Sequence, residues 1–155
     1  MTDPAPDRAT GPTFRLMYRS RNRIPQEQRK TELGLLFSQV RPNNKRQQIT
    51  GALLLSQDAF VQILEGEESA VRALFAKIEK DPRHDSVALL STGIVAERVF
   101  SRWAMAKVAD DGESDIPLIA NTRGISEAAS RGTTPEQNLV LDVMRQAARG
   151  EAHAI

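Results

Sequence analysis

A glutamine stands in the middle of an otherwise apolar strand face. Residues 60–66 read Phe-Val-Gln-Ile-Leu-Glu-Gly, and this alternation predicts a half-buried strand with Phe60, Gln62 and Leu64 on one face. Burying an amide without partners costs a few kcal/mol, so the site must supply donors and acceptors. An amide can reverse its hydrogen-bond pattern by flipping or by changing tautomer. Gln62 is therefore a candidate switch, although a glutamine at a sheet edge facing water is the better interpretation of this residue taken alone.

Other polar and aromatic residues could join it. Tyr18 is the only tyrosine and lies on the inward face of a predicted strand, where a phenol normally packs and bonds a nearby carbonyl. Trp103 and Met105, the former the only tryptophan, alternate onto one face of the predicted last strand, where such a pair is usually core. Asn43 and Asn44 are typical of a loop after a helix.

Three further positions carry weaker signals. Gly51, after Thr50 in a predicted strand, indicates either a bulge or the close approach of a bulky group. Arg83 and His84 follow the second predicted helix, where solvated charges are the ordinary interpretation. Lys30 lies on the polar face of the first predicted helix, from which it could reach a phosphate group.

Five segments, taken together and in order, resemble the BLUF family, the blue-light sensors that use flavin. The family pattern has a tyrosine on the first strand, an asparagine before a Thr-Gly strand, a Phe-x-Gln-x-Leu-Glu-Gly strand and a final Trp-x-Met strand. The chain carries it in residues 16–20, 43–55, 60–66, 82–84 and 103–105. The resemblance covers roughly residues 13–108, and the Thr-Gly and Phe-x-Gln-x-Leu-Glu-Gly block is its most specific part.

The resemblance implies a photochemical switch. Tyr18 would hydrogen-bond Gln62, and Gln62 would contact the flavin ring. Light would move an electron from Tyr18, with the proton following through the Gln62 amide, and the amide would end reoriented or tautomerised. The family uses Trp103 and Met105 as the output lever. No covalent bond to flavin forms, which suits a chain without cysteine.

The resemblance also implies how flavin is held. FAD is the family's usual cofactor, with FMN or riboflavin as alternatives. The Asn44 amide would pair with the polar edge of the ring. The ring would slot between the two predicted helices, against Ile24, Leu33, Phe37 and Ile63. The full candidate set for flavin contact is Tyr18, Lys30, Asn43, Asn44, Thr50, Gln62, Arg83, His84 and Met105.

The amino-acid composition argues against several other classes of function. Lys and Arg number 21 against 20 Asp and Glu, which gives no electrostatic case for nucleic acid or an anionic membrane. The absence of cysteine excludes disulfides and thiolate chemistry, and two histidines without a metal-binding spacing argue against a metal site. No run is apolar enough to span a membrane, and a cytoplasmic setting is expected.

The elements that position these residues follow from periodicity and from turn residues. We expect an α+β, ferredoxin-like order β-α-β-β-α-β-β, with a five-stranded mixed sheet and two helices on one face. The expected strands are 13–20, 49–55, 60–65, 87–95 and 102–108, and the helices are 25–40, ended by Pro42, and 69–80. Residues 1–12 are expected to be a disordered tail. Residues 109–155 are expected to form a helical extension that covers the other sheet face, with a short helix near 125–130 and a longer one capped by Thr134.

The leading hypothesis is thus a non-enzymatic blue-light receptor that signals to an unidentified partner protein and forms homo-oligomers. The alternative is a small ferredoxin-like enzyme of the acylphosphatase kind, without flavin, in which Arg19 and Asn44 would converge on a phosphate. An RNA-binding sheet is weaker, because aromatics make up only 5% of the chain. A yellow colour with a reversible red shift in blue light would separate these classes.

Overall fold

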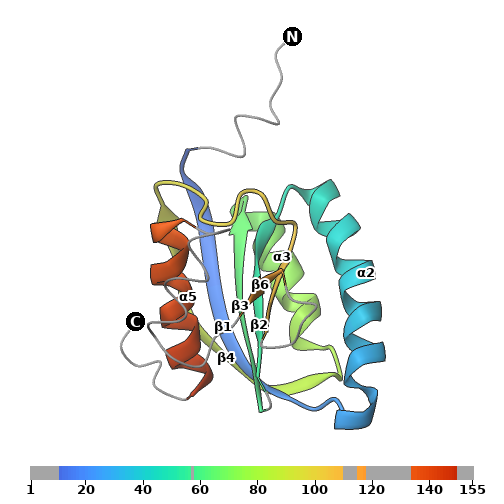
Figure 1. The fold of residues 1–155 in the computed structure, drawn as a ribbon. Coiled ribbons are helices and arrows are strands. Elements are labelled where there is room, and N and C mark those ends of the chain that lie inside the picture. The colour runs from blue at the N-terminus through green and yellow to red at the C-terminus, as the bar shows by residue number, and fades with distance from the viewer. Residues whose placement is uncertain (1–10, 57, 110–114, 118–133, 150–155) are drawn as a thin grey trace.

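The computed structural model describes residues 11–56, 58–109, 115–117 and 134–149, and the expected tail before residue 11 and short helix near 125–130 lie outside them. One mixed sheet runs in the order β4-β1-β3-β2-β5-β6 (Figure 1). Its strands are β1 (Thr13–Asn22), β2 (Thr50–Leu55), β3 (Ala59–Gly66), β4 (His84–Val95), β5 (Ala106–Ala109) and β6 (Ile116–Pro117). The helices are the 3-10 helix η1 (Gln26–Gln28), α2 (Arg29–Gln47), α3 (Glu68–Glu79) and α5 (Pro135–Ala148).

Strand pairing confirms the ferredoxin-like arrangement. β3 lies between β1 and β2 and is antiparallel to both, and β4 pairs antiparallel with the other side of β1. β5 adds to β2 in parallel, as the fifth strand of the expected order. The two-residue β6 extends the sheet beyond β5 and was not expected.

The two sheet faces bury separate cores. On one side α2 and α3 cover the sheet, and on the other α5 does, as the sequence predicted (Figure 1). Because side chains alternate along a strand, β3 sends Phe60 and Leu64 to the α2–α3 side, while Val61 and Ile63 go to the α5 side. The central strand β3 is buried along its whole length.

The prediction that Pro42 ends the first long helix is wrong. Helix α2 continues to Gln47, with Pro42 inside it, and ends at Gln48 in the left-handed conformation (φ 57°). A proline inside a helix costs about 3 kcal/mol. Tertiary contacts of the last turns oppose this cost: Arg41 Nε donates to the Met105 carbonyl (3.0 Å) and Asn44 Nδ2 to the Ala104 carbonyl (2.8 Å).

The last strand begins later in the structure than the sequence predicted, at Ala106 and not at residue 102. Residues 101–105 form turns and bends, and β5 starts only at Ala106. The two-residue alternation of a strand therefore does not apply to Trp103 and Met105, and the expectation that they share a face is wrong. Met105 is buried in the core under α2 and α3, while Trp103 packs against the core under α5.

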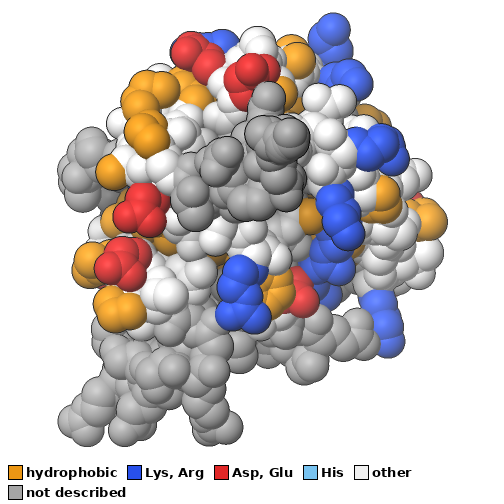
Figure 2. Space-filling model, turned by 90° about the horizontal axis from the view of Figure 1, so that it is seen from above, with side chains coloured by type: hydrophobic (Ala, Val, Ile, Leu, Met, Phe, Trp, Pro, Cys, Tyr) orange, Lys and Arg blue, Asp and Glu red, His pale blue; other side chains and the backbone are white. Residues whose placement is uncertain are grey.

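Charges of both signs share the surface. On the face seen from above, basic side chains gather mostly on the side where α2 lies, and acidic ones mostly on the side of α5 (Figure 2). The described residues contain no helix that is both long and apolar enough to cross a bilayer.

Gly51 marks a close approach within the protein itself. A Cβ at this position would lie 1.9 Å from the Ile63 carbonyl oxygen of the neighbouring strand. The bulky group expected beside this glycine is thus the backbone of β3, the strand that carries Gln62. Strand pairing at this point requires glycine.

We predict that Gly51→Ala lowers the free energy of unfolding by about 3 kcal/mol or more, because β2 must move away from β3. Gly34→Ala is the matched control, since a Cβ on this exposed position of α2 meets nothing within 4 Å. It should raise stability by roughly 0.5–1 kcal/mol. Urea unfolding of the two variants measures both effects, and equal stabilities would contradict the assignment.

Candidate functional site

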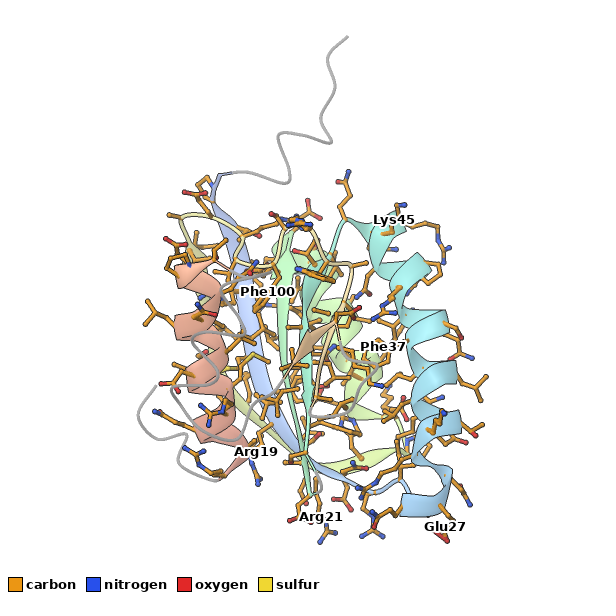
Figure 3. All side chains as sticks on the ribbon, viewed as in Figure 1. Arg19, Arg21, Glu27, Phe37, Lys45 and Phe100 are labelled. Atoms are coloured by element: carbon orange, nitrogen blue, oxygen red, sulfur yellow. The ribbon has the colours of Figure 1, made fainter. Side chains whose placement is uncertain are left out.

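A cavity opens between the sheet, α2 and α3. Its empty space, which includes the open mouth, is about 530 Å³. The walls are mainly aliphatic and aromatic, with a few polar groups among them. The lining residues are Tyr18, Leu36, Phe37, Val40, Leu53, Phe60, Gln62, Leu74, Ile78, Asp81, Arg83, His84 and Met105. Phe37 projects from α2 toward the sheet (Figure 3).

The Gln62 amide is satisfied at both ends. Tyr18 and Gln62 are directly opposite in the β1–β3 pair, and the Tyr18 hydroxyl donates to Gln62 Oε1. At the other end Gln62 Nε2 donates to the Met105 sulfur (3.3 Å). The side chain is only 5% exposed, so it does not face water at a sheet edge. The Gln62 amide therefore links the Tyr18 phenol on one side to the Met105 thioether on the other.

Tyr18 is held as a neutral phenol. Burial raises the pKa of its hydroxyl well above the ordinary value, and the negative charge of Asp81 raises it further. Its ring lies 5.4 Å from the Phe75 ring and 6.0 Å from the His84 ring, measured between centroids. The hydroxyl proton is thus kept on the oxygen and directed to Gln62.

Arg83 and His84 line the cavity, and both already have protein hydrogen-bond partners. Arg83 pairs with Asp81 (2.9 Å) and with Glu32 of α2 (3.3 Å). His84 Nε2 lies 2.6 Å from the Ile78 carbonyl, an acceptor, so this nitrogen carries a proton. The other ring nitrogen lies 2.6 Å from the Ser20 hydroxyl.

Asn44 has one amide end that lacks a partner. It is completely buried and lies on the same face of α2 as Phe37 and Val40, seven and four residues before it. Phe37 and Val40 line the cavity, whereas Asn44 is not among the lining residues. Its Nδ2 bonds the Ala104 carbonyl, but its Oδ1 is buried with no hydrogen bond. Asn43 instead turns outward and accepts from Arg46 (3.0 Å).

Other expected site residues lie elsewhere. Lys30 is exposed beside a second hollow that it shares with Phe37 and Arg41. Thr50 donates to the buried carboxylate of Glu65 (3.1 Å) and does not line the cavity. Among the residues expected against the ring, Ile63 faces the opposite core, so that expectation is wrong. Ile24 and Leu33 belong to the core on the cavity's side without lining it.

Several lining residues were not singled out from the sequence. Leu36 and Val40 lie in the predicted helix 25–40, and Leu74 and Ile78 in the predicted helix 69–80, without a predicted role in the site. Asp81 comes directly after the predicted helix 69–80, yet it faces the cavity and its charge raises the pKa of Tyr18. The sequence signal for Asp81 was its position directly before Arg83 and His84.

The residues present fit a flavin. An isoalloxazine ring is flat and apolar, with one polar edge where an N–H is flanked by carbonyls. The cavity offers apolar walls from both helices and from the sheet, and the Gln62 amide among its few polar lining groups. The unpartnered Asn44 Oδ1 is a buried acceptor of the kind that such an N–H would satisfy.

Comparison with solved structures extends over most of the chain. The photo-activated state of BlsA aligns with a TM-score of 0.63 and 30% identity, over 83% of this chain and 90% of that one. The dark state of BlrB, described as a BLUF protein, aligns with a TM-score of 0.63 and 26% identity, over 91% and 98%. BlrP1 of Klebsiella pneumoniae, solved with FMN and cyclic diGMP, gives 0.68 and 29%, over 88% and 34%.

Curated relatives are longer proteins. Photoactivated adenylate cyclase subunit beta of Euglena gracilis is 30% identical over 120 residues, which is 77% of this chain but 14% of that protein. The blue light- and temperature-regulated antirepressor BluF of Escherichia coli K12 is 32% identical over 90 residues, 58% of this chain and 22% of that protein. The chain thus spans less than a quarter of either relative.

The family model described as "Sensors of blue-light using FAD" matches residues 13–106, which include the cavity, Tyr18, Gln62 and Met105. This chain belongs to the BLUF family and is a blue-light sensor that binds flavin.

Proposed function

We propose that the cavity between α2 and α3 holds the isoalloxazine ring of FAD without a covalent bond, and that the Tyr18–Gln62–Met105 chain reads its excitation. The observation that carries this proposal is a buried amide with a phenol on one end and a thioether on the other, in the wall of an apolar slot. FMN is a second candidate cofactor, since BlrP1 was solved with it. Asn44 would hold the polar edge of the ring.

A bound flavin supplies blue-light absorption and the capacity to accept an electron and a proton. Tyr18 would be the residue that supplies both, because its phenol is neutral, buried and bonded to Gln62. The proton leaves through the Gln62 amide, whose oxygen is the acceptor nearest to it. The role of Gln62 would be to exchange its donor and acceptor ends, which an amide can do by flipping or by changing tautomer. After that exchange Gln62 Nε2 would no longer donate to the Met105 sulfur.

The energy of this change limits what it can do. One hydrogen bond contributes about 0.5–1.5 kcal/mol net. A signal of that size shifts an equilibrium between two packings by roughly two- to twelvefold, and cannot unfold the domain. The output is therefore a change in protein contact, and the receiver is a partner protein.

Self-association is a further part of the proposal. Strand β4 lies at the sheet edge, and Leu89 (49% exposed) and Ile94 (67% exposed) project from it. No Lys, Arg or Pro occurs from Val87 to Val95 to block pairing with another strand. A second copy of this chain, paired antiparallel along β4, would cover both residues. Light scattering of Ile94→Lys beside the unchanged protein tests for it.

The acylphosphatase-like alternative finds no support in this geometry. It requires Arg19 and Asn44 to meet at one phosphate. Arg19 Nη2 donates to the Ala148 carbonyl at the end of α5 (3.4 Å), on the opposite sheet face from Asn44 (Figure 3).

We predict that Gln62→Leu retains flavin but loses the reversible red shift in blue light. Leucine fills a similar volume but cannot exchange donor for acceptor. Absorption spectra in darkness and under blue light measure this, with Gln39→Leu on the exposed side of α2 as the control. A normal light-state spectrum in Gln62→Leu would exclude the switch role.

We predict that Tyr18→Phe keeps the fold and the flavin but loses the photocycle. Only the hydroxyl that donates to Gln62 is removed, while the ring contacts with Phe75 and His84 remain. Ultrafast absorption spectroscopy follows the electron transfer. A productive cycle in this variant would make Trp103 the donor.

We predict that Asn44→Ala weakens flavin binding by about tenfold or more, because it removes the buried unpartnered Oδ1. Asn43→Ala is the matched control, since the neighbouring side chain faces Arg46. Flavin titration followed by fluorescence compares them. Equal losses in both variants would remove Asn44 from the site.

A further inference from the structure

A second hollow, between α2 and β5, is lined by side chains that attract negative charge. Lys30 and Arg41 contribute to it from α2, and Lys107 from β5, while Asp115 is the one acidic residue among those that line it. Helix α2, from Arg29 to Gln47, carries five Lys or Arg and a single Glu. Basic side chains accordingly gather on this side of the surface (Figure 2). The electrostatic field around the hollow is therefore positive, although the charges of the whole chain nearly balance.

The chain already places one of its own carboxylates in this hollow. Asp115 Oδ2 accepts from Arg41 Nη2 (2.5 Å) and from the backbone N–H of Lys107 (2.8 Å). The Asp115 N–H in turn donates to the Lys107 carbonyl (2.9 Å). In the sequence, Asp115 is the last of four acidic residues between positions 110 and 115. The hollow thus binds a carboxylate that a peptide backbone presents.

The α2 side of the hollow has room for a peptide backbone. A Cβ on Gly34 would meet nothing within 4 Å, so the helix surface is open at this point. Further along α2, Pro42 has no N–H, and the helix therefore lacks the bond that residue 42 would otherwise donate to the Ser38 carbonyl. Ser38 and Pro42 both line the hollow. A ligand that has N–H donors as well as carboxylates would match these groups.

We propose that this hollow is a docking site for an acidic segment of a partner protein, which displaces Asp115 from Arg41. A peptide supplies carboxylates for a basic site and backbone N–H groups for the Ser38 carbonyl. The sugar–phosphate backbone of DNA supplies negative charge but no donor, so a protein segment is the better match. Asp115 acts as an internal competitor of that segment. The inference goes beyond the proposed function, because it depends on neither flavin nor light.

The test uses the full chain in darkness and a short fluorescein-labelled peptide of alternating Glu and Ala, with binding followed by fluorescence anisotropy at low salt. Added salt should weaken the binding, because exposed charges are screened. Gly34→Leu should weaken it by about tenfold or more without changing the net charge, since the new side chain fills the hollow. Gln39→Leu is the matched control, because this exposed position of α2 does not line the hollow. Urea unfolding checks that both variants are folded.

Asp115→Asn tests the internal competitor. It removes the charge that pairs with Arg41, so the affinity for the peptide should rise by up to about fivefold, the range of one exposed ion pair. Asp142→Asn is the matched control, since it also removes a carboxylate paired with an arginine, but on α5 at the other face of the sheet. It should change the affinity much less.

Equal gains in Asp115→Asn and Asp142→Asn would mean that only net charge matters, and would overturn the inference. The absence of peptide binding at low salt would also overturn it, as would undiminished binding to Gly34→Leu. A single-stranded oligonucleotide that binds more tightly than the peptide, and is lost in Gly34→Leu, would assign the hollow to nucleic acid instead. A lower mass of Gly34→Leu than of the unchanged protein in light scattering would assign it to a second copy of this chain.

Discussion

The site depends on a buried amide that must be bonded at both ends. Gln62 lies on a fully buried strand, where an unpartnered donor or acceptor costs about 1–3 kcal/mol. Tyr18 and Met105 come from two different elements, so satisfying one side chain fixes β1, β3 and the segment before β5 relative to one another. If the donor and acceptor ends of the Gln62 amide exchange, its hydrogen-bond partners must therefore change their own hydrogen bonds. The need for partners at both ends makes Gln62 costly to bury. The same need means that a change at one end of the amide affects the residue bonded to the other end.

The position of β3 determines where such a change can go. As an interior strand with a covered core on each face, it sends Gln62 toward α2 and α3 and Glu65 toward α5. The cavity lies on one face and the capped helix on the other, and residues 99–105 connect the two. Gly51 allows β2 to approach the β3 backbone closely, so the strand that carries both side chains is held firmly.

Much of this arrangement was predictable from residue patterns. Alternation predicted the inward strand faces that carry Tyr18 and Gln62, periodicity predicted the helices that correspond to α2 and α3, and Thr134 predicted the start of α5. The errors have one cause, which is that tertiary contacts overrode local rules. Contacts with residues 104 and 105 oppose the helix-breaking effect of Pro42. Hydrogen bonds outside a strand ladder separate Trp103 from Met105, and no period-based rule detects them. The residues around Glu65 in the sequence likewise do not predict that its carboxylate accepts hydrogen bonds from distant backbone N–H groups.

Helix α5 is attached at both of its ends, through Gln137 to Val99 and through Ala148 to Arg19. A helix covalently joined to the surface that it covers behaves as a tethered ligand, and tethering raises its effective concentration at that surface without any new contact. A separate molecule that presents an equivalent helix would have to compete with this internal ligand and would not meet an open surface. A partner helix can therefore bind the sheet face under α5 only if it displaces α5. Loosening either end of α5 makes that displacement easier.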